Sequence, residues 1–517
     1  MESTPPAKAR EGNGTKQRGE DRVQTGASMH VLPQPAWVGA GLRKSLRLRH
    51  GHIEFLGRDI ATPLVLLALA EFLVLMGSLY LAVQLRFPGE PTAALATVQD
   101  NLLLKMLTFA MVNLIAMLSM GLYRKGACNG FVSTLLRLSG GLAFGAGVLA
   151  VLFYVLPGLT LGRGVLVLAF GLAVLGLLVT RFVGVRLLEM KAFRRRVLVL
   201  GAGRKASQLE EIRTREDQPP FELFGFVPAN TESFEVPPEH VVEPDLPLAQ
   251  YAQRNHVDDV VIALDEARGA FPLDELMACK MGGIDVLEIS DFLEREAGIL
   301  KLDSLRPSTM IFARGFKQSL YRDVTKRVLD VTTSLVLLLV AWPFMLLTAL
   351  GILIESRGRG SVLFRQVRVG QHGRHFTLLK FRSMIMEAES DGVARWAEQA
   401  DPRITRFGRF IRKTRFDELP QLFNVLRGDM SFVGPRPERP VFVRHLAEHL
   451  AHYEHRHWVK PGLTGWAQIH YPYGASLKDA LEKLQYDLYY VKNQSITLDL
   501  LTIVQTVEVV LWGRGSR

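Results

Sequence analysis

Cysteine is scarce in this chain of 517 residues, where only Cys128 and Cys279 occur and neither belongs to a CxxC pair. This scarcity excludes a disulfide framework and a thiolate metal site, and it is typical of a reducing compartment. Acidic residues are also in the minority, with 51 against 62 lysines and arginines, which gives a net charge of +11. Such a charge suits nucleic acid, anionic lipid or phosphorylated substrates, and composition alone does not separate these three classes of partner.

Charged residues are few in four long stretches that follow the N-terminal segment. Residues 1–50 are polar and lack a run that could bury itself, which predicts a disordered basic tail without a cleavable signal. Apolar runs then cover residues 63–84, 102–123, 132–156 and 164–179. Each is close to the ~20 residues that a helix needs to cross a bilayer. We therefore expect four transmembrane helices within residues 51–190.

One acid, Glu71, lies inside the first of these runs. An ionisable residue within a membrane span is a functional candidate. Because no obvious basic partner lies in the other runs, we favour a neutral or interface-directed acid at a helix contact.

A fifth apolar run, residues 331–354, has cations on both flanks, among them Lys326, Arg327, Arg357 and Arg359. The positive-inside rule then favours the cytoplasm for both ends. Pro343 lies near the middle and removes a backbone hydrogen bond, so a helix could turn back inside the bilayer there. We predict a kinked, re-entrant helix. The same rule places the tail and all that follows the fourth helix on the cytoplasmic side.

Residues 191–312 contain no long apolar run but alternate between strand and helix patterns, which predicts a small parallel, Rossmann-like α/β domain. Its first strand leads into "GAGRKA", with Gly201 and Gly203. This glycine turn is a weak dinucleotide signal, because the motif is GxGxxA and no acid follows the second strand where a ribose would need one. Nucleotide binding and a structural or regulatory role both stay open.

Two adjacent acids, Asp417 and Glu418, stand in "RKTRFDELPQL" after a run of cations and before Pro420. An N-cap of a following helix would explain Asp417 without any chemistry. Arginines recur at every third position around this stretch, and they indicate either an anion-binding edge or a solvated helix paired with acids such as Glu389 and Asp391. The repeated arginines are Arg403, Arg406, Arg409, Arg412 and Arg415.

The last 190 residues or so resemble the bacterial sugar transferase family, the monotopic phosphoglycosyl transferases. The motifs that carry the resemblance are "KRVLD", "FRQVRVG", "KFRSM", "DELPQLFNVLRGDMSFVGPRP", "PGLTGWAQ" and "YDLYYVKN", in this order. Four spans and an α/β domain ahead of them are similar to the large exopolysaccharide-initiating members, and "HYPYGAS" resembles an exosortase-associated subset. The implied fold is a membrane protein with a four-helix transmembrane bundle, a Rossmann-like α/β domain and a re-entrant-helix α/β phosphoglycosyl transferase domain over residues 313–517.

The resemblance implies transfer of a sugar-1-phosphate from a UDP-sugar to undecaprenyl phosphate in the bacterial inner membrane, with the catalytic domain on the cytoplasmic face. The resemblance also implies that membrane lipid is a partner of the protein and that nucleic acid is not. A homo-oligomer is compatible with it. Asp417 would be the nucleophile, and Glu418 would share a Mg²⁺ ion with it. A carboxylate suits this role because it forms a reactive mixed anhydride with phosphate.

Other residues take roles from the same resemblance. The donor-binding candidates are Lys380, Arg382, Arg412, Pro435 and Arg436. Pro343, Lys326 and Arg327 are structural candidates, and Asp487 is either a second acid near the metal or a solvated helix position. A degenerate transferase, acting as a scaffold or nucleotide sensor of polysaccharide assembly, is the alternative function.

Overall fold

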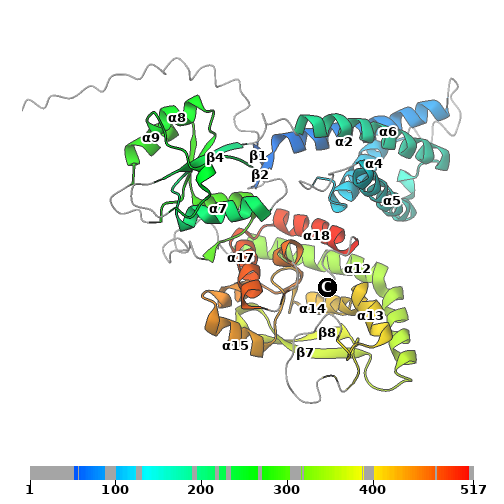
Figure 1. Cartoon of the computed structure of the whole chain (residues 1–517). Helices are drawn as coiled ribbons and strands as arrows, with labels where there is room; N and C mark the ends of the chain where they lie inside the picture. Colours follow the sequence, from blue (N-terminus) through cyan, green and yellow to red (C-terminus); the bar gives the residue numbers. More distant parts are fainter. Residues whose placement is uncertain are drawn as a thin grey trace, which may run out of the picture. The chain divides into compact units, whose positions relative to one another are not determined.

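The computed structural model describes most of the chain from residue 52 to residue 511. The described residues are 52–55, 58–87, 100–123, 131–188, 195–215, 221–228, 234–265, 271–302, 316, 319–386, 388, 401–471, 474 and 476–511. The predicted tail, Cys128, Glu389 and Asp391 lie outside them. The described residues form three groups of elements along the chain, and each group is taken by itself (Figure 1).

The first group is a short antiparallel hairpin followed by four long helices. The hairpin, which the sequence did not predict, pairs β1 (His52–Phe55) with β2 (Arg58–Ala61). The helices are α2 (Thr62–Arg86), α4 (Leu102–Ser119), α5 (Phe131–Val155) and α6 (Arg163–Leu188), with a 3₁₀ turn, η1 (Pro157–Leu159), before the last. They bury a shared apolar core that includes Leu75, Phe109 and Leu177. All four are long and apolar enough to cross a membrane.

A buried polar cluster joins these helices and corrects the expectation for Glu71. Arg181 on α6 places its Nε 2.8 Å from Glu71 Oε1, and both side chains are buried. Tyr123 donates a further hydrogen bond to the carboxylate. The expectation of no basic partner was wrong, because α6 continues to Leu188 and therefore carries Arg181 as an inward-facing partner. The expected helix contact is present, between α2 and α6.

The second group is a parallel α/β domain, as the sequence predicted. Its strands are β3 (Arg195–Leu200), β4 (Phe221–Val227), β5 (Asp259–Ile262) and β6 (Asp285–Glu288), in the order β4-β3-β5-β6. The helices are α7 (Arg204–Arg215), α8 (Leu248–Arg254), α9 (Leu273–Met281) and α10 (Ile289–Ala297), with a 3₁₀ turn, η3 (Pro238–His240), after β4. Residues of α7 and α10 share one core cluster and those of α8 and α9 another, so helices cover both faces of the sheet (Figure 1).

The third group begins with α12 (Leu320–Glu355), a 36-residue helix with Pro343 inside it. A hairpin follows, formed by β7 (Leu363–Val369) and β8 (His375–Phe381) with the turn η5 (Gln371–Gly373) between them. The parallel strands β9 (Ser431–Val433) and β10 (Gly462–Thr464) make a second, smaller sheet. The remaining elements are α13 (Arg406–Lys413), η6 (Phe416–Glu418), α14 (Gln421–Arg427), α15 (Pro440–His449), η7 (Tyr453–Trp458), α16 (Trp466–His470), α17 (Leu477–Asn493) and α18 (Ile496–Leu511).

Both ends of α12 are attached to this third group. Near the start, Asp330 Oδ1 accepts hydrogen bonds from Ser431 Oγ (2.9 Å) and Phe432 N (2.8 Å) on β9. Near the end, Glu355 Oε1 accepts from the Phe407 amide of α13 at 2.9 Å. The helix bends along its length (Figure 1). Many of the apolar side chains between the two attachments are exposed, including Leu339 at 75%.

Candidate functional site

The two adjacent acids lie in a tight turn between α13 and α14. Arg415 starts this turn with φ of 62°, a left-handed conformation that is uncommon for a residue other than glycine. Phe416, Asp417 and Glu418 then form the short helix η6, and Pro420 takes the N-cap position of α14 without a side-chain cap. Asp417 therefore does not cap a helix, and that explanation for its presence is wrong.

Glu418 is surrounded by cations from three segments of the chain. Its Oε1 lies 3.3 Å from Lys380 Nζ on β8, 3.1 Å from Arg436 Nη2, and 3.6 Å from Arg415 Nη1. Burial alone would raise the pKa of Glu418, but these three cations together hold it well below its usual range. The cations thus favour the ionised form of Glu418, which contacts both Lys380 and Arg436.

Asp417 has the opposite environment, although it is the next residue. Its side chain is buried, with 7% of the residue exposed, and Oδ1 has no hydrogen-bond partner among the described residues. Burial raises the pKa of Asp417, and the negative charge of Glu418 adds to this, while Lys380 opposes it. Two neighbouring carboxyl groups with pKa values pushed apart are a pattern of sites where each has its own chemical role.

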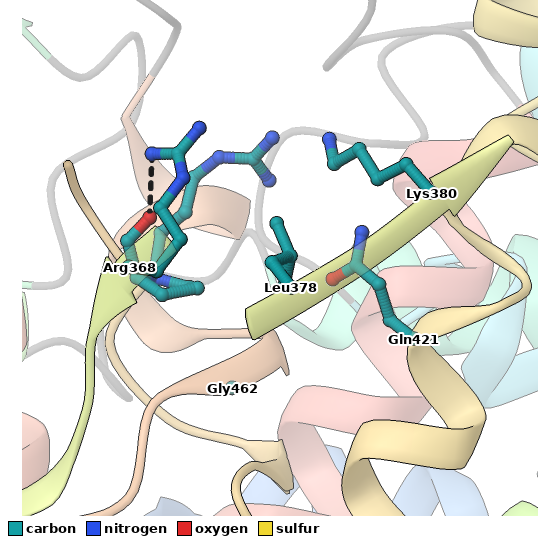
Figure 2. Close-up of a pocket in the computed structure, with 7 residues that line it drawn as sticks. Arg368, Leu378, Lys380, Gln421 and Gly462 are labelled. Carbon is teal, nitrogen blue, oxygen red and sulfur yellow. Dashed lines mark hydrogen bonds between the residues drawn. The ribbon is translucent and has the colours of Figure 1, made fainter. Parts of the chain in front are cut away.

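An open polar pocket, of about 230 Å³ with the solvent at its mouth included, lies next to Glu418 (Figure 2). Neither acid lines it, but two of its lining residues, Lys380 and Arg436, contact the Glu418 carboxylate. Its lining residues are Arg368, Leu378, Lys380, Gln421, Arg436, Pro437 and Gly462. Figure 2 shows Lys380 and Gln421 extending toward the same space from β8 and α14. Three cations in so small a space suit a phosphate or diphosphate group, because charge-assisted hydrogen bonds to such anions are strong.

The Arg436 side chain is oriented from both sides. Its Nη1 donates to Gln468 Oε1 at 2.9 Å, while Nη2 donates to Glu418. Arg456 Nη2 donates to the Arg436 carbonyl at 3.0 Å and also pairs with Asp487 Oδ2 at 2.8 Å. Asp487 is 3% exposed, so the solvated-helix interpretation is wrong for it. Its observed partner is a buried arginine that supports the pocket.

Comparisons with known proteins show which family the chain resembles in sequence. The family model described as bacterial sugar transferase matches residues 321–513. The chain is 34% identical over 370 residues, or 69% of its length, to an undecaprenyl-phosphate glucose phosphotransferase of Komagataeibacter xylinus, and the match covers 67% of that relative. The chain belongs to the bacterial sugar transferase family.

Two further relatives of this bacterial sugar transferase differ in the sugar that their names give. A UDP-N-acetylgalactosamine-undecaprenyl-phosphate N-acetylgalactosaminephosphotransferase of Aeromonas hydrophila is 38% identical over 53% of this chain and 62% of its own length. A UDP-glucose:undecaprenyl-phosphate glucose-1-phosphate transferase of Xanthomonas campestris pv. campestris is 36% identical over 51% of this chain and 55% of its own. The chain thus spans between about half and two thirds of the length of these three relatives.

Not every predicted donor-binding residue of this sugar transferase lines the pocket. Lys380 and Arg436 do, whereas Arg382 donates to the Arg359 carbonyl at 3.0 Å and the Pro435 carbonyl accepts from the Gly462 amide at 2.9 Å. Arg412, in the last turn of α13, is close enough for its charge to lower the pKa of Asp417 against the effect of burial.

The arginine repeat does not continue along one helix. Arg403 precedes α13 and pairs with Asp401 at 2.6 Å, and Arg415 follows α13 in its left-handed turn. Glu389 and Asp391, the acids that were expected to pair with the repeat, both lie outside the described residues. Asp401 takes that role for Arg403, so ion pairing explains one end of the repeat and the Glu418 contact explains the other.

Lys326 and Arg327 join the start of α12 to the parts that carry the site. Lys326 Nζ is buried and donates to Asp499 Oδ2 at 2.8 Å and to the Val433 carbonyl of β9 at 3.1 Å. Arg327 donates two hydrogen bonds of 2.6 Å to the Val425 and Leu426 carbonyls in the last turn of α14. A cation there complements the negative end of the helix dipole.

Sequence reasoning missed several residues of this site: Arg368, Gln421, Arg456 and Gln468. Three of them stand inside motifs that were quoted for the family resemblance, namely Arg368, Gln421 and Gln468. The signal was present in the motifs, but nothing in their spacing indicates which side chains turn toward a common pocket.

The glycine turn of the α/β domain is occupied by the chain itself. Asp265, which follows β5, accepts hydrogen bonds from the Arg204 amide (2.7 Å, Oδ2) and the Lys205 amide (2.9 Å, Oδ1) at the start of α7. A Cβ at Gly203 would lie 2.1 Å from the same carboxylate. These amides are the donors that would face a dinucleotide pyrophosphate in a Rossmann fold, and here they already have an anionic partner.

The residues at the dyad fit a divalent cation in their chemistry. Mg²⁺ prefers carboxylate and phosphate oxygens, and Asp417 Oδ1 is a buried carboxylate oxygen without a hydrogen-bond partner among the described residues. Glu418 already shares its Oε1 with three cations. Asp417 is therefore the better candidate ligand, and Glu418 is the weaker one.

Proposed function

We propose that this protein transfers a sugar-1-phosphate from a UDP-sugar to undecaprenyl phosphate through a covalent aspartyl intermediate. UMP would be released, and the lipid-linked product would start the assembly of an exopolysaccharide. The observation that carries the proposal is the buried Asp417 carboxylate, whose Oδ1 lacks a partner among the described residues while its neighbours supply a cationic pocket.

The proposed reaction has two displacements at one phosphorus atom. An Asp417 carboxylate oxygen attacks the β-phosphorus of the UDP-sugar, the bond from that phosphorus to the bridging oxygen breaks, and UMP leaves with the electron pair. A phosphate oxygen of undecaprenyl phosphate then attacks the same phosphorus and releases the carboxylate. Because both nucleophiles are anions that approach a charged phosphate, each step needs positive charge around the phosphoryl oxygens.

The pocket residues divide this task. Lys380 contributes a point charge beside both acids, while the planar guanidinium of Arg436 is suited to hold two phosphoryl oxygens. Glu418 keeps both cations in position because its Oε1 contacts each of them. When bound, Mg²⁺ would neutralise charge on the diphosphate and on the leaving UMP. Asp417 would hold the ion, with Glu418 beside it.

The membrane arrangement belongs to the same proposal. Helices α2, α4, α5 and α6 would form a four-helix transmembrane bundle, and α12 would enter the bilayer of the bacterial inner membrane and return to the same face. Support for the return comes from two attachments of α12 within the third group of elements, to β9 through Asp330 and to α13 through Glu355. A helix that crossed the bilayer fully would place these attachments on opposite sides. The cation-rich flanks favour the cytoplasm for that shared side.

The direct test is UMP release by the purified full-length protein with undecaprenyl phosphate and Mg²⁺. A panel of UDP-sugars is needed, because the named relatives differ in their sugar. We expect release with at least one donor, and loss of release with EDTA. The covalent step is tested without acceptor, where we expect one equivalent of UMP and a sugar-phosphate adduct on the peptide that contains Asp417, found by mass spectrometry.

Each negative result would exclude a different part of the proposal. Turnover that survives in Asp417→Asn would exclude the aspartyl intermediate, and turnover in EDTA would exclude the metal requirement. No UMP from any donor, with folded protein, would favour the catalytically degenerate scaffold. The α/β domain gives the nucleotide-sensor version of that alternative little support, since Asp265 occupies its glycine turn.

A further inference from the structure

Outside the catalytic pocket, the exposed face of α15 brings together three side chains that can bind a metal ion. His445, Glu448 and His449 are exposed, and each offers a ligand atom such that all three atoms lie within 4.8 Å of one another. Their positions are i, i+3 and i+4, which places them on one face of the helix. Val443 and Leu446 occupy the opposite face and are buried, so the cluster is not needed for packing.

A hydrogen bond within the helix fixes the tautomer of one imidazole. His449 Nδ1 lies 2.8 Å from the His445 carbonyl oxygen. Because a carbonyl oxygen can only accept, Nδ1 carries the proton when the ring is neutral, and Nε2 keeps its lone pair. Metal-ligating histidines are usually oriented by this kind of hydrogen bond from the second ring nitrogen to a backbone carbonyl. The two rings are close, with centroids 4.5 Å apart.

The position at the end of the helix also favours a cation. α15 ends at His449, and the last carbonyl groups of a helix carry partial negative charge. A solvated polar face would have the same exposure, but it requires neither two histidines one turn apart nor a carboxylate between them. Imidazole nitrogen and carboxylate oxygen are the ligands that Zn²⁺ takes in sites where water completes the tetrahedron.

We propose that His445, Glu448 and His449 form a surface site for Zn²⁺, with water as the fourth ligand. The site is distinct from the Mg²⁺ position of the proposed reaction, since Mg²⁺ prefers an all-oxygen shell and the α15 site offers two nitrogens. Bound Zn²⁺ would tie together the last turn of α15. The proposal does not depend on the transferase reaction.

Isothermal titration calorimetry with Zn²⁺ tests the site in full-length, untagged protein stripped of metal and kept in excess Mg²⁺. We expect one Zn²⁺ ion per chain. His449→Ala and His445→Ala should each weaken the affinity for Zn²⁺ by about 10-fold or more. Loss of a residue that only orients a metal ligand already costs about 10-fold, and these two variants each remove a ligand. The matched control is His375→Ala, an exposed histidine on β8, which should leave the affinity unchanged.

A second measurement avoids any effect of substitution on folding. In the wild-type protein, Zn²⁺ should protect His445 and His449 from diethylpyrocarbonate, as read by mass spectrometry, while His375 stays reactive. Failure to bind Zn²⁺ would overturn the proposal. So would binding that survives in the His445→Ala/His449→Ala double variant, because the ion would then be held by other residues.

Discussion

The α/β domain and the catalytic domain each present a place where a phosphate group could bind, and the two differ in how the chain itself satisfies the groups there. At the glycine turn, the Arg204 and Lys205 amides point at an anion, but the anion is the Asp265 carboxylate. In the catalytic pocket, Lys380 and Arg436 share a carboxylate that is itself ionised, and the next carboxylate has an oxygen without a described partner.

The difference shows that a motif indicates donors, while the rest of the fold decides whether these donors are already satisfied. A buried polar group without a partner costs free energy, and Asp417 Oδ1 is one of several such atoms among the described residues. Asp417 differs from the others because it adjoins Glu418, whose carboxylate is shared by Lys380 and Arg436. This combination is why the proposed function assigns the chemistry to Asp417 and leaves the turn at Gly203 a structural role.

The largest expected effect is the loss of turnover in Asp417→Asn. The amide keeps the shape of the side chain but cannot act as an anionic nucleophile, so UMP release should fall by about 10³-fold or more. Asp274→Asn, which changes an exposed carboxylate on α9, is the matched control and should keep full activity. Equal rates for the two variants would remove Asp417 from the chemistry.

Arg436→Lys should have the next largest effect. Arg436 contacts Gln468 and Glu418 through two different nitrogens, and a lysine ammonium does not reproduce that fork. We expect kcat/KM for the UDP-sugar to fall about 10²-fold. Arg427→Lys is the control, because that side chain is 63% exposed and pairs with Asp429 at the surface. A wild-type value in Arg436→Lys would mean that the pocket needs only a point charge there.

Asp265→Ala should affect the α/β domain and leave UMP release unchanged. The substitution removes the acceptor for two amides at the start of α7, which should cost about 1–2 kcal/mol of local stability. Hydrogen–deuterium exchange of the first turn of α7 should then be faster by about 5- to 30-fold.

The same exchange experiment can show whether the glycine turn binds a dinucleotide, which would contradict the difference described between the two domains. If a dinucleotide slowed exchange at Arg204 and Lys205 in the wild-type protein, the ligand would have displaced Asp265, and the turn would be a binding site after all. The exposed Asp274→Asn variant again serves as control, since it should change exchange only near its own position on α9.

The smallest expected effect is that of Asp417→Asn on the free energy of unfolding. This substitution should raise stability although it lowers activity. Because burial raises the pKa of Asp417 above its ordinary value of 3.8, the native state holds more protons than the unfolded state between these two pKa values. Stability therefore falls as pH rises through this window, and the ionised carboxylate lowers stability at every higher pH. Asp417→Asn removes this penalty.

We expect Asp417→Asn to stabilise the catalytic domain at neutral pH, by the roughly 0.5–2 kcal/mol typical of a relieved functional strain. The gain should disappear as the pH falls below 3.8, where the wild-type carboxyl group becomes neutral in both states. Thermal unfolding at several pH values, compared with Asp274→Asn, measures this. A destabilised Asp417→Asn at neutral pH would contradict the environment that we describe for the dyad.

Local patterns predicted much of the fold. The four long helices cover the predicted apolar runs almost completely, and the strands β3 to β6 lie within residues 191–312, where a parallel α/β domain was predicted. The hairpin β1–β2 was missed, because its strands HIEF and RDIA contain charged residues and lack an apolar run such as the one in β3.

The sequence predicted which residues belong to the site better than it predicted which of them form ion pairs. Motif order gave Lys380, Arg436, Asp417 and Glu418, which the structure brings together. The pairing of Asp487 with Arg456, like that of Glu71 with Arg181, joins residues 31 and 110 positions apart. Such pairs depend on how helices pack, and nothing in their local sequence specifies the partner.

The attachment of both ends of α12 gives the catalytic turn a fixed height above the bilayer in the proposed arrangement. One end is bonded to β9 and α14, the other to α13, and the turn with Asp417 lies between α13 and α14. The depth to which α12 enters the lipid would then set the distance between the carboxylate and the headgroup plane, where an acceptor phosphate resides. Bilayer thickness would then change the rate of turnover through the depth of α12, without a ligand that binds to the protein.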